Sequence, residues 1–183
     1  MLSTLSKSLA KRYGHVHGWN NSMMNNGYYI RYFSTTEDGK PRVLFVCVAN
    51  SCRSQLAEAL GRKYLSDIYE VHSAGSTPST PNPLAIEFLK NKGYDTSELY
   101  SKSYADIPKP VNIAIALCDE GDMECNSYFD TSILERRCWS QKDPVKVDGS
   151  EGDKMEVMET VYNNIEKLMI EFKEQSLKDL KKN

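Results

Sequence analysis

A strand-like run that ends at a thiol and turns through a short loop into a helix constrains this chain more than any other feature. The stretch Cys47-Val-Ala-Asn-Ser-Cys-Arg53-Ser54 follows the apolar run Val-Leu-Phe-Val. In such a turn the loop amides and the positive end of the helix dipole converge on one point, and the Arg53 guanidinium can add a bidentate fork. The same field favours the thiolate form of Cys47. We therefore expect a charged nucleophile beneath a bound tetrahedral oxyanion.

The Cys47-x5-Arg53 spacing alone is a weak signal, because a chain with five cysteines can produce it by chance. The context strengthens it. Residues 42–48 have the composition of a short, Val-rich buried strand, and apolar residues recur at helical spacing directly after the loop: Leu56, Leu60, Tyr64 and Ile68. The alternative is a buried free cysteine at a strand end beside an arginine that caps a surface.

Composition sets the frame for this site. With 183 residues, 40% of them hydrophobic, the chain can build one ordinary domain core. A net charge of −2 is not the excess of positive charge that is typical of a nucleic-acid-binding protein. No apolar run approaches the roughly 18 residues needed to cross a bilayer. The five cysteines lack a secretory context and a framework spacing, which is typical of intracellular thiols. We expect one catalytic domain with no nucleic-acid partner and no membrane insertion.

The first 40 residues differ from the remainder, residues 41–183. The basic residues of the first 35 positions are not accompanied by Asp or Glu: Lys7, Lys11, Arg12 and Arg31. Leu2, Leu5 and Leu9 follow helical intervals. This pattern resembles a mitochondrial transit peptide, with residues 31–34 as a processing site. The alternative is a solvated, disordered tail on a cytoplasmic protein.

After this leader, strand-like and helix-like segments alternate without an internal repeat. The predicted strands are residues 42–48, 70–73, 112–117 and 137–140, and the predicted helices are residues 54–69, residues 84–92 and a long one from residue 153 onward. Such alternation predicts a parallel α/β sheet with ligands outside the carboxyl ends of its strands. Cys47 and Cys118 both follow strands, so we expect them to approach each other.

Four motifs occur in the order of a known family: the loop Asn50-Ser-Cys-Arg-Ser-Gln-Leu-Ala-Glu58, Ser73-Ala-Gly75, the spacing from Cys118 to Cys125, and Asp143-Pro144. Over about residues 41–175 the chain resembles the low-molecular-weight protein tyrosine phosphatase fold, and within it the thioredoxin-coupled arsenate reductases. The resemblance implies a four-stranded parallel sheet flanked by helices, with an anion-binding Cys-x5-Arg loop after strand one.

The resemblance also implies the roles of the site residues. Cys47 is expected as the nucleophile, Arg53 as the oxyanion clamp and Asp143 as the general acid, while the Ser54 hydroxyl can donate to the Cys47 thiolate. The loop residues expected around the oxyanion are Val48, Ala49, Asn50, Ser51, Cys52 and Arg53. In the family a second thiol attacks the nucleophile and a third attacks the second, and Cys118 and Cys125 match these positions. The resulting disulfide is reduced by thioredoxin or a similar dithiol.

No tightly bound cofactor is expected. Some family members bind potassium near the loop, and Asn50, Glu58 and Ser73 fall where such ligands would lie, although Ser101-Lys-Ser103 replaces an expected acidic position. A zinc site is not predicted, because no Cys-x2-Cys pair occurs and His72 is the one histidine of the domain. The third loop position, often Gly in the family, is Ala49 here, so Asn50 is expected to adopt the left-handed turn.

Each assignment has a structural alternative. Cys118 can be a buried strand-end thiol, Cys125 an ordinary loop cysteine, and Asp143 a turn residue before proline. Cys52 can form a protective disulfide with Cys47, although we favour a packing role, and we interpret Cys138 as structural.

We interpret the chain as an arsenate reductase. The first competing function is a phosphatase of the same fold acting on phosphate monoesters. Val145-Lys146 after Asp143-Pro144 replaces the aromatic pair that lines a phosphotyrosine slot, which argues against it. The second is a non-catalytic thiol sensor or arsenite-binding module.

Overall fold

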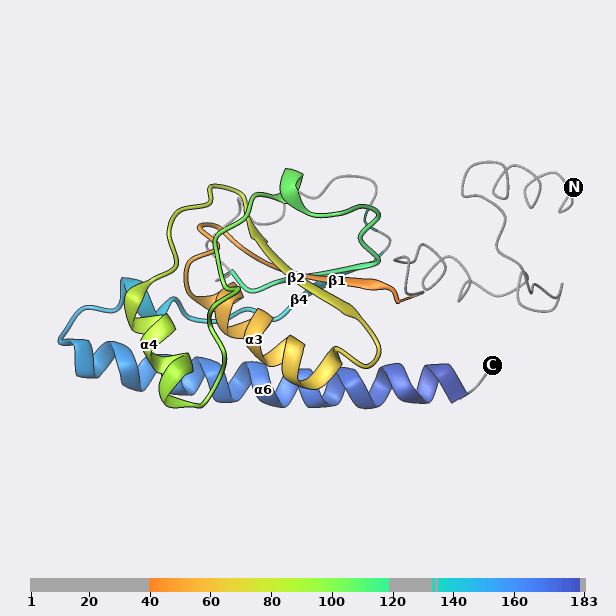
Figure 1. Cartoon of the computed structure of the whole chain (residues 1–183). Coiled ribbons are helices and arrows are strands. Elements are labelled where there is room, and N and C mark those ends of the chain that lie inside the picture. Colours follow the sequence, from red (N-terminus) through yellow and green to blue (C-terminus); the bar gives the residue numbers. More distant parts are fainter. Residues whose placement is uncertain (1–39, 119–132, 134, 182–183) are drawn as a thin grey trace, which may run out of the picture.

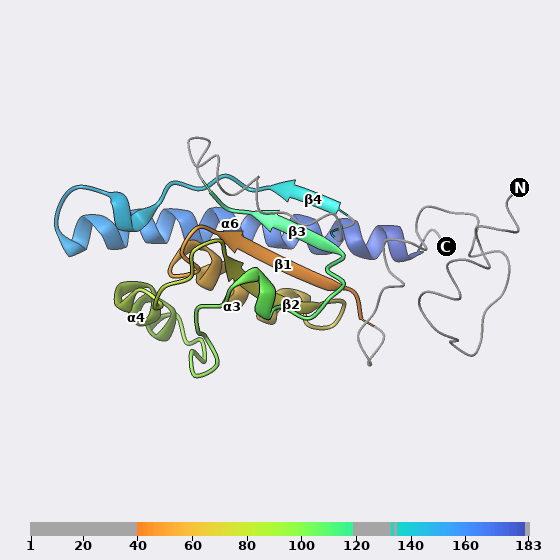
Figure 2. The ribbon, with the colours of Figure 1, turned by 90° about the horizontal axis from the view of Figure 1, so that it is seen from above.

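Four parallel strands form one sheet in the order β2-β1-β3-β4 (Figures 1 and 2). The strands are β1 (Arg42–Cys47), β2 (Glu70–Gly75), β3 (Ile113–Ala116) and β4 (Glu135–Cys138). The computed structural model describes residues 40–118, 133 and 135–181. The leader expected over residues 1–40 therefore lies, apart from Lys40, outside the described residues.

The two central strands, β1 and β3, consist mostly of apolar residues, as expected for strands that are buried in the middle of a sheet. All residues of β3 are buried, as are all residues of β1 except the first, whereas β4 at the edge alternates between half-buried and exposed positions. The predicted strands are therefore confirmed, with β4 beginning two residues earlier than expected. Its Glu135 and Arg137 lie on the half-buried side and form an ion pair of 2.6 Å there, so its sequence lacks a hydrophobic signal.

Three long helices pack on one face of the sheet: α3 (Arg53–Leu65), α4 (Pro83–Asn91) and α6 (Glu151–Lys181). Figures 1 and 2 show α6 running along the sheet, with α3 beside it and α4 next to α3. Two short 3₁₀ helices, η2 (Tyr104–Asp106) and η3 (Pro144–Lys146), lie in the connections. Helix α3 ends four residues before the predicted end at residue 69, where Ile68 and Tyr69 instead form hydrogen bonds to the Leu65 carbonyl.

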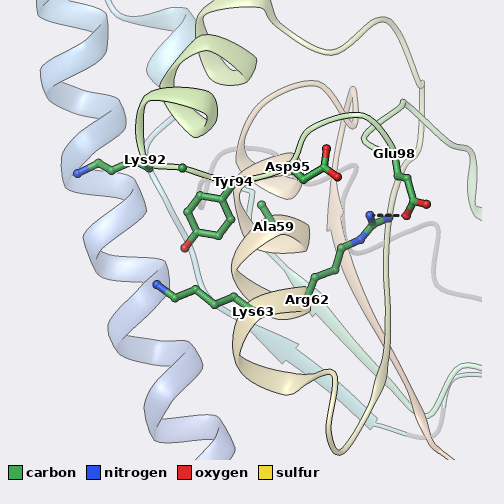
Figure 3. Close-up of a pocket in the computed structure, with 8 residues that line it drawn as sticks. Ala59, Arg62, Lys63, Lys92, Tyr94, Asp95 and Glu98 are labelled. Atoms are coloured by element: carbon green, nitrogen blue, oxygen red, sulfur yellow. Dashed lines mark hydrogen bonds and ion pairs between the residues drawn. The ribbon is translucent and has the colours of Figure 1, made fainter.

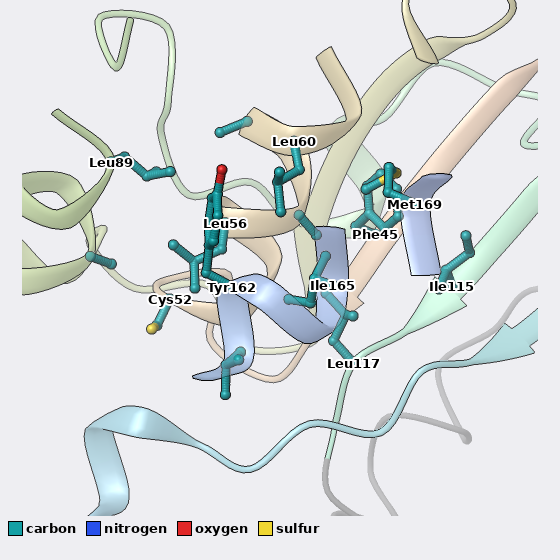
Figure 4. Packing of buried hydrophobic residues seen from close by; sticks show 14 of the residues in the cluster. Phe45, Cys52, Leu56, Leu60, Leu89, Ile115, Leu117, Tyr162, Ile165 and Met169 are labelled. Atoms are coloured by element: carbon teal, nitrogen blue, oxygen red, sulfur yellow. The ribbon is translucent and has the colours of Figure 1, made fainter. Parts of the chain in front are cut away.

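The main core lies between the sheet and these helices (Figure 4). Phe45 and Ile115 of the sheet meet Leu56 and Leu60 of α3 and Ile165 of α6, and all five are fully buried. A second cluster covers the opposite face and contains Leu44, Val46 and Ala114. None of the helices in the described part of the chain is long and apolar enough to span a membrane.

Candidate active site

The loop of residues 48–52 joins the carboxyl end of β1 to the amino end of α3, and its carbonyl groups point away from the loop centre. The amides of Thr77, Ser79 and Asn82 donate to the carbonyls of Val48, Ala49 and Ser51, respectively, at 2.9, 3.0 and 2.8 Å. The Asn50 carbonyl accepts from the Gln55 side chain at 2.8 Å and the Ser101 hydroxyl at 2.7 Å. In a trans peptide the N–H points opposite to the C=O. The N–H groups of residues 49–52 are therefore turned inward, as an oxyanion requires.

Asn50 holds this loop in shape. Its φ of 46° is left-handed, which confirms the expected turn position. Its side-chain nitrogen donates to the hydroxyls of Ser54 and Ser73, both at 2.8 Å, and its side-chain oxygen accepts from the Lys102 amide at 2.7 Å. This buried amide thus uses both hydrogens and its oxygen, so the loop has little freedom to rearrange around it.

Cys47 and Ser54 lie in contact at the bottom of the loop, both buried, with 2.9 Å between sulfur and hydroxyl oxygen. The Ser54 oxygen already accepts from Asn50, so its own hydrogen is available for Cys47.

Arg53 contacts Asp143 across a long stretch of sequence. Its Nη2 lies 2.8 Å from the Asp143 carboxylate, and its Nη1 donates to the carbonyls of Gln141 and Leu117 at 3.2 and 3.4 Å. The second Asp143 oxygen accepts from the Val145 amide at 3.1 Å, which caps η3. Arg53, the expected oxyanion clamp, is therefore in contact with Asp143, the expected general acid. Arg53 also contacts Leu117, the residue directly before Cys118.

Cys118 is buried in the same cluster as Cys47, on the face of the sheet opposite the long helices. The two residues follow or end adjacent strands, as expected from their places in the sequence. Cys118 is oxidised in a disulfide, whereas Cys47, Cys52 and Cys138 are free. Cys125 lies outside the described residues.

Cys52 packs into the main core at the start of α3 (Figure 4), which supports a packing role. Burial raises the pKa of the Cys52 thiol well above its usual range, and the charges of Asp143 and Cys47 add to this while Arg53 opposes it. Cys52 is therefore protonated at neutral pH and a poor nucleophile. Cys138 is exposed on β4.

The residues expected around potassium come together, but a lysine lies among them. Ser73 donates to the Glu58 carboxylate and accepts from Asn50. The Lys102 ammonium lies 3.0 Å from the same Glu58 oxygen, so the expected potassium ligands do not fit a further cation here. No group of three or more His, Cys, Asp or Glu residues among those described could hold a metal ion.

Two residues of this site had no assigned role in the sequence interpretation. Lys102 stands between two serines and has no hydrophobic periodicity around it, so the charge reversal at an acidic family position was the one available signal. Gln55 is buried and donates to the carbonyls of Asn50 and Tyr100 at 2.8 and 3.1 Å.

A pocket of about 360 Å³ opens elsewhere, between the second half of α3 and the segment after α4 (Figure 3). The residues that line it include Arg62 and Lys63 of α3 and Lys92, Tyr94, Asp95 and Glu98, and Arg62 forms an ion pair of 3.1 Å with Glu98. None of the described residues that line this pocket is a cysteine, and the loop lies at the other end of α3. The loop is therefore the candidate active site.

Known proteins resemble this chain over its described domain. Residues 42–183 match the low molecular weight phosphotyrosine protein phosphatase family. An arsenate reductase of Halalkalibacterium halodurans is 35% identical over 136 residues, which are 74% of this chain and 96% of that protein. An arsenate reductase of Bacillus subtilis is 32% identical over 72% of this chain and 94% of its own. A solved arsenate reductase in its phosphate-binding state has a TM-score of 0.61 and 25% identity, over 74% of this chain and 98% of its own.

Proposed function

The chain belongs to the low molecular weight phosphotyrosine protein phosphatase family and is an enzyme of the arsenate reductase type within it, and from this premise we propose that three cysteines reduce arsenate in turn. The oxyanion binds to the inward amides of residues 49–52 and to the Arg53 guanidinium. The contact between Cys47 and Ser54 at 2.9 Å supports Cys47 as the thiolate nucleophile.

In the first step the Cys47 sulfur attacks arsenic, so that an S–As bond forms and an As–O bond breaks. The leaving oxygen takes a proton from Asp143 and departs as water. The 2.8 Å contact between Arg53 and Asp143 supports Asp143 as the general acid. When Arg53 binds the oxyanion, this contact holds the Asp143 carboxyl group beside the oxygen atoms of the oxyanion. Arsenic is still As(V) at this stage, and a phosphate ester would react in the same way.

In the second step the Cys118 thiolate attacks the Cys47 sulfur. An S–S bond forms, the S–As bond breaks, and its electron pair stays on arsenic, which leaves as As(III). Cys125 then attacks Cys118, which releases the Cys47 thiolate and leaves a Cys118–Cys125 disulfide. Two electrons have passed from two thiols to arsenic. Thioredoxin or a similar dithiol reduces the disulfide, and no tightly bound cofactor takes part.

The oxidised state of Cys118 in the cluster that also buries Cys47 carries this proposal. A phosphatase hydrolyses its phosphoryl adduct with water and has no use for a second buried thiol at this place. A reductase needs one there, because the S–As bond is broken by attack on sulfur rather than by water.

Serine variants of the three cysteines test the relay. Cys47→Ser should abolish both arsenate reduction and aryl phosphate hydrolysis, since both need the nucleophile. Cys118→Ser and Cys125→Ser should keep weak aryl phosphate hydrolysis but lose multiple turnover of arsenate with a thioredoxin system. In the Cys125→Ser protein, one turnover should release arsenite and trap a Cys47–Cys118 disulfide, detectable by peptide mass mapping.

Cys138→Ser is the matched control, because Cys138 is exposed on the edge strand. It should retain full thioredoxin-driven turnover. Full turnover by Cys118→Ser would instead contradict the relay and favour a phosphatase or reduction by an external thiol. If the unaltered protein turns over neither arsenate nor an aryl phosphate, the thiol sensor or arsenite-binding module takes the place of the reductase.

A phosphatase remains the second candidate because the loop and Asp143 serve both reactions. Its use on phosphotyrosine is disfavoured by η3, where Val145 and Lys146 replace an aromatic pair. We expect hydrolysis of small aryl phosphates that is slow beside arsenate reduction.

We also propose that residues 1–40 are a mitochondrial transit peptide ahead of a catalytic domain of residues 41–183. The family match from residue 42 onward supports the boundary, and the basic composition supports the destination. A fluorescent protein fused after residue 40 should enter mitochondria and be cleaved near Ser34. Diffuse cytoplasmic fluorescence with an intact N-terminus would support the cytoplasmic alternative.

A further inference from the structure

A continuous set of hydrogen bonds links a buried lysine to the nucleophile. The Lys102 ammonium contacts Glu58, Ser73 donates to the same Glu58 oxygen, and Asn50 donates to Ser73. Asn50 also donates to Ser54, which contacts the Cys47 sulfur at 2.9 Å. The backbone of Lys102 joins the set a second time, because its amide donates to the Asn50 side-chain oxygen at 2.7 Å.

The direction of each bond follows from the chemistry of the groups. The Asn50 oxygen accepts from a backbone amide, so its nitrogen must be the donor to both serines. Ser73 therefore has its own hydrogen free for Glu58, and Ser54 has its own for Cys47. At the other end of this set, the Glu58 carboxylate accepts hydrogen bonds from Ser73, Lys102 and Arg62.

Such a carboxylate needs a cation, because it is 1% exposed and an unpaired buried charge is costly. Two cations among the described residues contact it. Lys102 is 5% exposed and is held at 3.0 Å by the Tyr100 carbonyl, with the Tyr100 ring 4.3 Å from its nitrogen. Arg62 binds the other oxygen at 2.7 Å but is 37% exposed and lies on the pocket of Figure 3, where water can replace it.

We propose that the Lys102 ammonium is a built-in cation that takes the place of a bound potassium ion and positions Cys47 through Glu58, Ser73, Asn50 and Ser54. Its oxygen neighbours, a carboxylate and a carbonyl, are the ligand types that an alkali cation uses, and an ammonium group is close to potassium in size. Lys102 is thus a positioning residue that does not touch the substrate. The inference rests on the proposed role of Cys47 as nucleophile and makes that nucleophile independent of potassium.

The unaltered full chain gives the first test. We measure its melting temperature and the rate at which iodoacetamide alkylates Cys47, in potassium chloride and in sodium chloride at equal ionic strength. The melting temperature should be the same in the two salts, and the alkylation rates should agree within about twofold. A saturable rise in either with potassium would overturn the proposal. Neither readout needs arsenate turnover, so failure here is distinguishable from failure of the reductase function.

Variants give the second test. Lys102→Met removes the charge at similar length and should slow Cys47 alkylation about tenfold, the rate equivalent of losing one hydrogen bond to a charged group. Lys102→Ala leaves space among the same oxygen atoms, so potassium but not sodium should restore part of the rate. Lys102→Arg keeps the charge, so it should slow Cys47 alkylation less than Lys102→Met does.

Arg62→Met is the matched control, since it removes the exposed cation from the same carboxylate and should slow alkylation less than twofold. A folded Lys102→Met protein that melts at a lower temperature but alkylates at the normal rate would reduce Lys102 to a stabilising ion pair and overturn the proposal. If Lys102→Met does not fold, the salt comparison on the unaltered chain and the potassium rescue of Lys102→Ala decide the question.

Discussion

Gly75 shows how closely a neighbouring strand backs the anion loop. It ends β2 opposite Cys47, and a Cβ at this position would lie 2.5 Å from the Val48 carbonyl oxygen and 2.7 Å from the Asn50 nitrogen. Both atoms belong to the loop backbone, which cannot turn aside as a flexible side chain can. The absence of a side chain at Gly75 is therefore a requirement of the loop.

Gly75→Ala should displace the loop and weaken oxyanion binding. The phosphate concentration needed to protect Cys47 from iodoacetamide should rise at least about tenfold, because the inward amides no longer point at the same oxyanion position. The measurement is the phosphate concentration that halves the alkylation rate.

Gly61→Ala is the control for this prediction. A Cβ there would meet the side chains of Phe45 and Val71 at 2.8 Å, so it overpacks the core by a similar amount, worth about 1–3 kcal/mol. It should destabilise the fold and leave phosphate protection intact. Equal protection in both variants would mean that Gly75 serves packing alone.

At the scale of elements, helix α4 is tied to the loop through its cap. The Asn82 side chain accepts from the amides of Leu84 and Ala85 at 2.9 and 3.4 Å, and Pro83 occupies the first helical position. The Asn82 amide donates in turn to the Ser51 carbonyl at 2.8 Å. The residue that begins α4 therefore also turns one loop peptide outward.

Asn82→Ala should cost about 1 kcal/mol of the free energy of unfolding, because two helical amides lose their acceptor. Urea unfolding measures this loss. Asn82→Asp keeps a side-chain oxygen at the cap and should stay close to the unaltered protein. Since the Ser51 contact comes from the backbone, alkylation of Cys47 should be unchanged in both variants.

At the scale of the whole molecule, carboxylates with lowered pKa values link stability to acidity. A hydrogen bond from Lys173 of α6 holds the pKa of Asp67 below its ordinary value of 3.8, across an ion pair of 2.8 Å. Hydrogen bonds from Ser103 and Ser150 lower the pKa of Asp106 and Asp153 in the same way. Each group binds its proton less tightly in the folded than in the unfolded protein.

These groups therefore stabilise the fold above pH 4, and their contribution is lost as the pH falls below 3.8 through the folded values. Urea unfolding should show a falling free energy between about pH 4 and pH 2. Asp67→Asn should flatten part of that fall, by less than about 1 kcal/mol because the pair is exposed. An unchanged pH profile in this variant would assign the acid sensitivity to other groups.

Local sequence patterns were sufficient to predict the order of the helices and strands and the strand-loop-helix unit around Cys47. Both are local: residues 43–47 form an apolar run, the helical period begins at Leu56, and Asn50 is the loop residue that tolerates a left-handed φ. The weakest strand signal was at β4, because Glu135 and Arg137 occupy the half-buried side of this edge strand, where a strand pattern would have apolar residues.

The residues that meet at the loop from distant parts of the chain could be identified from the folded structure alone. Arg53 and Asp143 are 90 positions apart, and Lys102 reaches Glu58 across 44. Gly75 meets the loop because β2 pairs with β1, an order that alternation of elements does not specify. These contacts depend on how the whole chain packs. Sequence periodicity indicates which face of a helix or strand is buried, but it does not indicate which other element packs against that face.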